Sequence, residues 1–162
     1  MSGTIEIVTA ASLDLDTCRR LVLGNEPWIT LRYDDADVHS IVRSVGNAHL
    51  LVAQAGERTV GFALSAPGIL LGEYLKLLVV EPERQSQGVG RRLMEELERR
   101  AFRHWPNVYL CVSDFNTRGR QFYYRLGYEE VGILPNLLLP GKGEVLMRKS
   151  IAAWREFHRA AL

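Results

Sequence analysis

A glycine-rich turn, Gln85–Gly90, is the stretch of this 162-residue chain whose residues most clearly suggest a chemistry. An apolar run of strand length, Leu75–Val80, precedes it, and apolar residues at helical spacing follow it over 93–101. A helix therefore begins near Gly88 or Val89, with several backbone N–H groups that have no intrahelical acceptor. Because glycine lets the backbone approach a ligand closely and the helix dipole is positive at this end, the turn is typical of a phosphate or pyrophosphate site.

Two widespread phosphate-binding motifs do not fit this turn. No Gly-Lys-Ser/Thr follows it, so the lysine and the magnesium-binding hydroxyl of a P-loop are missing. The dinucleotide-binding fingerprint needs three glycines in a different spacing, whereas only Gly88 and Gly90 stand here. The segment Val79–Glu83 followed by Gln85–Gly90 instead resembles motif A of the GCN5-related N-acetyltransferase (GNAT) superfamily. In that family the amides of the turn hold the pyrophosphate of acetyl-coenzyme A.

The resemblance implies a set of coenzyme-binding residues around the turn. Splayed strands at motif A of the family offer a backbone N–H to the thioester carbonyl, and by position this role falls to Leu78, Val79 and Val80. Arg91 and Arg92 follow the turn directly. We assign Arg91 to a coenzyme phosphate, with a solvated helix face as the alternative. The turn itself contributes Gln85, Ser86, Gln87, Gly88, Val89 and Gly90.

A second segment, Asn116–Tyr128, is similar to motif B of the same family, an asparagine followed by a helix that ends in Leu-Tyr-Glu-Lys-Leu-Gly-Phe. Aligned without gaps, Asn116 takes the place of the asparagine that contacts the coenzyme, and Tyr123 that of the tyrosine next to its sulfur. The resemblance implies direct attack of an amine on the thioester, with Tyr123 as the acid that protonates the departing sulfur. A merely packed aromatic is the alternative, since Phe122 and Tyr124 flank it.

The general base is where the sequence departs from the pattern of the family. Some relatives carry a glutamate twelve positions before the tyrosine, where this chain has Cys111, a poor base at neutral pH. Others carry it on the motif A strand, at the place of Tyr74, with Glu73 beside it. Because side chains alternate along a strand, Glu73 and Tyr74 cannot both face the acceptor. Glu73 is the candidate base. The alternatives are that Glu73 is a solvated strand-end residue, that Asp114 serves as base or helix cap, and that water takes the proton.

Few residues of the sequence indicate where the amine acceptor binds. In the family, the first two helices and the loop between the last strands wall the amine site. Glu26 and Trp28 lie in the first of these segments, the region of the first two helices. A carboxylate and an aromatic ring there suit an ammonium group. The alternative is that Trp28 fills core, while Asp34 or Asp35 caps the second helix. The histidines show no ligand spacing, so we expect no metal site.

Composition restricts the class of protein. The chain is 47% hydrophobic and 24% charged, as is usual for one globular domain, which we expect to cover 1–162. A formal net charge of +1 disfavours nucleic acid and an anionic membrane as partners. Cys18 and Cys111 do not form a disulfide or metal pattern. With no signal peptide and no apolar run of membrane-spanning length, a cytoplasmic location is expected.

Hydrophobic patterning predicts strands that alternate with helices, without internal repeats or linkers. The expected strands cover 5–9, 49–53, 60–65, 75–80, 108–112, 128–134 and 144–148. The expected helices cover 13–22, 35–45, 88–101, 116–126 and 151–161, the first capped by Ser12 or Asp14. This order is that of the GNAT fold, an α/β (α+β) domain with a mixed sheet of six to seven strands and helices on both faces.

The function implied by the resemblance is transfer of an acetyl group from acetyl-coenzyme A to a primary amine on a small molecule or peptide. A non-catalytic sensor that binds acyl-coenzyme A on the same fold is the alternative, which the cysteine at position 111 keeps open. The acceptor itself stays open, because fold does not choose among amines. A homodimer is one of the assemblies that the resemblance allows.

Overall fold

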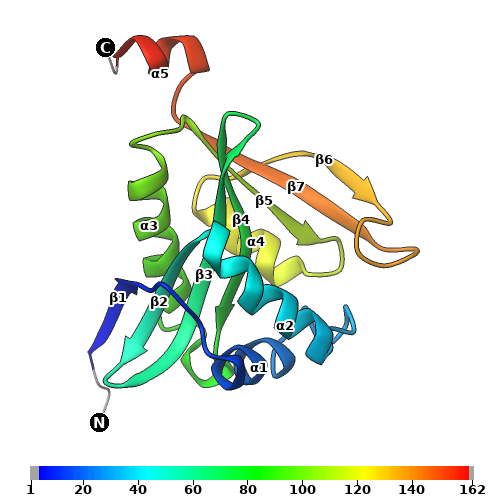
Figure 1. The fold of residues 1–162 in the computed structure, drawn as a ribbon. Helices are drawn as coiled ribbons and strands as arrows, with labels where there is room; N and C mark the ends of the chain where they lie inside the picture. Colours follow the sequence, from blue (N-terminus) through cyan, green and yellow to red (C-terminus); the bar gives the residue numbers. More distant parts are fainter. Residues whose placement is uncertain (1–3, 161–162) are drawn as a thin grey trace. The chain divides into compact units, whose positions relative to one another are not determined.

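The computed structural model describes residues 4–160. Seven strands in this range form one mixed sheet with the order β1-β2-β3-β4-β5-β7-β6 (Figure 1). The strands are β1 Ile5–Thr9, β2 His49–Ala55, β3 Arg58–Ile69, β4 Gly72–Val80, β5 Asn107–Ser113, β6 Glu129–Pro135 and β7 Gly143–Ser150. The helices are α1 Leu15–Leu23, α2 Asp35–Ser44, α3 Val89–Ala101, α4 Thr117–Arg125 and α5 Trp154–Ala160, with short 3-10 turns η1 Val45–Asn47 and η2 Pro82–Arg84. The predicted fold class is confirmed.

The sheet is mixed because the β4–β5 pairing is parallel, whereas β1–β2, β2–β3, β5–β7 and β6–β7 are antiparallel. Both β3 and β4 are longer than predicted and meet in a two-residue turn, Leu70 and Leu71, with φ of 47° and 58°. Side chains of β5 hold this turn: Tyr109 Oη donates to Leu70 O at 3.3 Å, and Asn107 Nδ2 donates to Leu71 O at 3.1 Å. The Ala-Pro-Gly run at 66–68 hid this extension from the sequence pattern.

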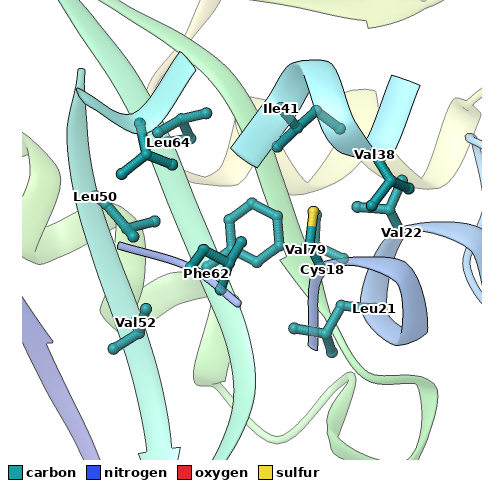
Figure 2. Packing of buried hydrophobic residues seen from close by; sticks show 12 residues of the cluster. Cys18, Leu21, Val22, Val38, Ile41, Leu50, Val52, Phe62, Leu64 and Val79 are labelled. Atoms are coloured by element: carbon teal, nitrogen blue, oxygen red, sulfur yellow. The ribbon is translucent and has the colours of Figure 1, made fainter. Parts of the chain in front are cut away.

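The chain divides into two compact units. The first contains the residues up to 66 together with 77–97, and the second contains 67–76 together with the residues from 98 onward. In the first unit, α1 and α2 pack on β2, β3 and the end of β4, around the fully buried ring of Phe62 (Figure 2). The other members of this core include Cys18, Leu21, Val22, Val38, Ile41, Leu50, Val52, Leu64 and Val79.

Acidic residues set the starts of α1 and α2. Asp14, rather than Ser12, caps α1, because its Oδ1 accepts from Thr17 N at 2.8 Å. Asp34 caps α2 in a capping box with Asp37, in which each side chain accepts a hydrogen bond from the other's backbone N–H. Asp35 instead accepts from Arg19 Nε at 2.7 Å. Helix capping is therefore the role of Asp34, as the sequence allowed.

In the second unit, β5 pairs with β7, and β7 pairs with β6. Strand β6 is therefore the last strand of the sheet on this side. One face of these strands buries Val108, Leu110, Val112, Val145 and Met147. The last helix, α5, begins at Trp154 rather than at the predicted Ile151, and the predicted last residue, Ala161, lies outside the described residues.

Two kinds of feature are absent from residues 4–160. No group of three or more histidine, cysteine, aspartate or glutamate side chains is placed to hold a metal ion there. No helix in the same range is long and apolar enough to cross a membrane.

Candidate functional site

The glycine-rich turn lies between η2 and α3, as predicted. Gly88 has φ of 83°, which favours glycine, and its carbonyl accepts from Arg92 N at 3.0 Å, so α3 begins directly after it. By helix geometry, the N–H groups of Val89, Gly90 and Arg91 have no intrahelical acceptor. A Cβ added to Gly88 would meet nothing within 4 Å in the chain. The turn therefore has open space beside N–H groups at the positive end of a 13-residue helix.

Two amide side chains, the buried Asn25 in the loop after α1 and the half-buried Gln85, support this turn. Gln85 Nε2 donates to Asn25 Oδ1 at 2.7 Å and to Val80 O at 3.0 Å. Asn25 Nδ2 donates to the same carbonyl at 3.1 Å and to Leu21 O at 2.9 Å, and Asn25 is only 3% exposed. The side chain of Gln85 thus positions the turn. Sequence reasoning missed Asn25, because the contact joins residues 60 positions apart.

A buried carboxylate fixes the end of the strand before the turn. Glu81 Oε2 accepts from Arg20 at 3.0 Å and from Arg58 at 2.9 Å, and Arg84 lies 3.8 Å from the other oxygen. Within the turn, Gln87 Nε2 donates to the carbonyl oxygen of Glu83, four residues earlier, at 2.7 Å. The rigid support of the turn is therefore built from polar side chains in the first unit.

The motif A strand reaches the turn with Val79 buried and with Leu78 and Val80 half-buried. Gly61 on β3 permits the close approach of this strand, because a Cβ there would lie 2.7 Å from Val79 O. The two arginines after the turn are both engaged within the first unit. Arg91 Nε pairs with Glu95 at 2.8 Å on the exposed face of α3, and Arg92 donates to Ile5 O on β1 at 2.8 Å.

Asn116 is the cap of α4, its Oδ1 accepting from Gly119 N at 2.9 Å. A Cβ at position 119 would lie 2.5 Å from Asn116 Nδ2, so the glycine leaves room for the amide. Asp114 does not cap this helix, because its Oδ2 accepts from Gly143 N at 2.8 Å and so joins the end of β5 to β7. Contact of Asn116 with the coenzyme stays a prediction.

Tyr123 on α4 is 9% exposed and lies edge-on to two aromatic rings, Phe122 at 5.0 Å and Tyr128 at 5.7 Å between centroids. Burial raises the pKa of the Tyr123 phenol well above its ordinary value. The hydroxyl is therefore protonated at neutral pH, which a general acid requires. Tyr124 is 41% exposed, and its hydroxyl hydrogen-bonds to Glu130.

Glu73 is 2% exposed, so the expectation of a solvated strand-end glutamate is wrong. The parallel pairing places Glu73 opposite Val108 and Tyr74 opposite Tyr109. Cys111 lies two residues after Tyr109 and therefore shares its face, and Tyr74 forms a side-chain hydrogen bond with Cys111. Tyr74, and not Glu73, is thus on the face of the sheet that carries Cys111.

A cluster that sequence reasoning missed lies on the same face as Cys111. Ser113 Oγ donates to Glu144 Oε1 at 2.6 Å across the β5–β7 pairing, and Glu144 is 4% exposed. Burial is the main cause that raises the pKa of Glu144, with the charge of Asp114 adding to it and the Ser113 hydrogen bond opposing it. The available signal was one glutamate at the start of an otherwise apolar segment, Gly143–Met147.

The predicted acceptor residues lie in the loop after α1. Glu26 is exposed, and its Oε2 accepts from Thr30 N at 3.1 Å. Trp28 is half-buried and packs against the core of the first unit. This packing agrees with the alternative hypothesis that Trp28 fills core. An exposed carboxylate therefore stands two positions from an aromatic ring that is fixed by the core.

A family model described as an acetyltransferase (GNAT) domain matches residues 46–130, just over half of the chain. An uncharacterised N-acetyltransferase of Methanocaldococcus jannaschii is 32% identical over 100 residues. This match covers 60% of the present chain and 64% of the relative, so it spans less than two thirds of the relative's own length.

Solved structures share the fold. The ribosomal-protein-S18-alanine N-acetyltransferase of Escherichia coli has a TM-score of 0.76 at 20% identity, with 93% of this chain and 97% of that chain covered. An aminoglycoside 6'-N-acetyltransferase complexed with coenzyme A has a TM-score of 0.71 at 22% identity, with 90% and 98% covered. The family model spans the glycine-rich turn and all of α4. The chain belongs to the GNAT acetyltransferase family.

Proposed function

We propose that the protein is an acetyl-coenzyme A-dependent N-acetyltransferase, which moves the acetyl group to a primary amine by direct attack on the thioester. The observation that carries this proposal is the turn before α3 in a chain of the GNAT family. Its open space and its N–H groups, at the positive end of the helix, suit a pyrophosphate.

Acetyl-coenzyme A is the cosubstrate that these residues fit. The N–H groups at Val89, Gly90 and Arg91 supply donors to the phosphates, and the support from Asn25 and Gln85 holds them in place. The structural relative described as complexed with coenzyme A has the same fold. The residues assigned to the coenzyme are Leu78, Val79, Val80, Gln85, Ser86, Gln87, Gly88, Val89, Gly90, Arg91, Asn116 and Tyr123.

Tyr123 is the proposed general acid. As the amine nitrogen bonds to the carbonyl carbon, the carbon–sulfur bond breaks, and the Tyr123 phenol gives its proton to the thiolate. The Tyr123 phenol, whose pKa is raised by burial, carries its proton at neutral pH, and it can give this proton to the thiolate only where the sulfur lies within hydrogen-bond distance. Its burial keeps water from competing for the same proton transfer.

The proposed acceptor is an amine on a small molecule or peptide, with Glu26 and Trp28 as the residues that receive it. The two structural relatives are described as acting on an alanine of a ribosomal protein and on an aminoglycoside, and both acceptors are amines. A cytoplasmic location and a homodimer also remain proposals. Cys111, in place of a strand glutamate, favours one second candidate, an acyl-coenzyme A sensor without turnover.

The test is acetyl transfer from acetyl-coenzyme A to a panel of amines, read by product mass. The panel contains amino acids, polyamines, aminoglycosides and short peptides with varied N-termini. An acetylated product supports the enzyme and names its acceptor class. Absence of any product, with coenzyme bound in calorimetry, would contradict the enzyme and favour the sensor.

A further inference from the structure

Within residues 4–160, Glu144 is a buried carboxylate that accepts from a hydroxyl and has no cation paired with it. It is 4% exposed, and among the residues that the structure describes it takes part in no ion pair. Lys142, two positions away, has its Nζ over the ring of Phe115, 5.4 Å from the centroid. Burying an ionised carboxylate without a cation is costly, so its presence at this position calls for a function.

The neighbours of Glu144 on every packed strand define its environment. On β5 it lies directly opposite Ser113, and on β6 it lies opposite Leu134. Asp114, at the end of β5, is the second carboxylate nearby. The other titratable or charged residues on this face of β4, β5, β7 and β6 are Tyr74, Lys76, Tyr109, Cys111, Arg148 and Glu129.

Glu144 and the proposed acid lie on opposite faces of the same strands. Lys149 is five residues from Glu144 on β7, so strand alternation directs it to the other face. There its Nζ binds Glu98 of α3 at 2.6 Å and lies over the ring of Tyr128, 5.9 Å from the centroid. Tyr128 in turn packs edge-on to Tyr123. In direct acyl transfer the base contacts the attacking amine and the acid contacts the leaving thiolate, so the two groups need not lie on one face of these strands.

We propose that Glu144 is the general base of the acetyl transfer, a role that rests on the proposed function. The Glu144 carboxylate takes a proton from the acceptor ammonium and passes it to water. The neutral amine then bonds to the thioester carbon, and the carbon–sulfur bond breaks as the Tyr123 phenol gives its proton to the thiolate. The second proton of the nitrogen passes through solvent and restores the phenol. One proton is thus released to solvent, and one ends on the thiol of coenzyme A.

The environment of Glu144 matches this role. Because burial and Asp114 raise its pKa, Glu144 is a stronger proton acceptor than an exposed glutamate. Ser113 holds one carboxylate oxygen in place and leaves the second oxygen for the amine. Removing the Ser113 hydroxyl would raise the pKa further, because this hydrogen bond lowers it.

The deciding experiment measures kcat/KM against pH for wild type and for Glu144→Gln, with an amine that the panel identifies. Glutamine is isosteric and can still accept from Ser113, so the fold and the coenzyme affinity should hold. We expect kcat to fall by about 100-fold or more, and the acid limb of the profile to disappear. In Ser113→Ala, the acid limb should move to higher pH, which a merely structural role of Glu144 would not produce.

Two further variants serve as a control and as a test of the competing base. Glu57→Gln, in the exposed β2–β3 turn, is the control, and its profile should equal that of wild type. Glu73→Gln tests the base predicted from the sequence. Wild-type turnover with an unchanged limb in Glu144→Gln would overturn the proposal, as would loss of turnover in Glu73→Gln alone. Wild-type protein that binds coenzyme and acetylates nothing would overturn the proposed function as well, so the two failures are distinguishable.

Discussion

At the scale of single residues, the packing of Tyr123 is compatible with the proposed acid role, although the sequence presented the two as alternatives. It packs edge-on between Phe122 and Tyr128, and the same burial keeps its phenol protonated. A packed aromatic and a general acid are therefore compatible descriptions of one side chain. The motif match could indicate the tyrosine, but the cause of its raised pKa is a property of the folded environment.

Replacing Tyr123 by phenylalanine should lower kcat by about 100-fold, because a general acid contributes at least that factor. Coenzyme affinity should hardly change, since the ring remains in its aromatic contacts. The measurement pairs steady-state kinetics with calorimetric binding of coenzyme A. Tyr124→Phe is the matched control, because this exposed neighbour hydrogen-bonds to Glu130 and should leave turnover unchanged. Turnover of Tyr123→Phe at the wild-type rate would remove the acid assignment.

Gly88 tests the phosphate-binding turn by its backbone. A side chain at φ of 83° is strained by about 1–2 kcal/mol and also fills the open space beside the turn, so Gly88→Ala should weaken coenzyme binding. Gly56→Ala is the control, because Gly56 also has positive φ, 62°, and open space, but lies in the β2–β3 turn. Both variants should lose stability, and only Gly88→Ala should lose affinity in calorimetry. Equal coenzyme affinity in the two variants would argue against a coenzyme site at the turn.

At the scale of elements, the sequence predicted the strands, turns and helix caps that depend on residues close together in the chain. The strand, turn and helix around Gln85–Gly90 and the cap of α4 at Asn116 follow from residues a few positions apart. The amide bridge from Gln85 to Asn25 does not, because it depends on how the loop after α1 folds back toward β4. The turn is thus predictable from sequence, whereas its support is not.

That bridge predicts the behaviour of Asn25→Ala. Loss of this buried amide removes the donor to Leu21 O and Val80 O and leaves Gln85 Nε2 with one acceptor instead of two, so the free energy of unfolding should fall by about 1–3 kcal/mol. Coenzyme affinity should fall with it, because Gln85 then holds the turn less firmly. Urea denaturation and calorimetry measure the two effects, with the exposed Asn47→Ala as control. A variant that loses stability but retains full coenzyme affinity would show that the bridge does not position the turn.

At the scale of the whole molecule, the order of strands and helices was predictable because each element carries its own hydrophobic period. The β5–β7 pairing was not, and it brings Ser113 to Glu144 across 31 positions of sequence. The two positions at which the family carries its base correspond to Cys111 and Tyr74, with Glu73 beside the second, so they do not include the carboxylate of Glu144 on the strand next to β5. Long-range register is the information that the sequence alone lacks here.

The free energy of unfolding should depend on pH through the titration of Glu144. Its pKa in the folded protein is raised above the ordinary value of 4.5, so the folded state holds the proton more tightly than the unfolded chain. The stability linked to this group is complete below the unfolded pKa and is lost as pH rises through the folded pKa. Glutamine does not titrate, so Glu144→Gln should melt above wild type at pH 8, and this advantage should disappear toward pH 4. Thermal melts across this range measure the difference, and a constant difference at all pH values would show that the two states bind the proton equally.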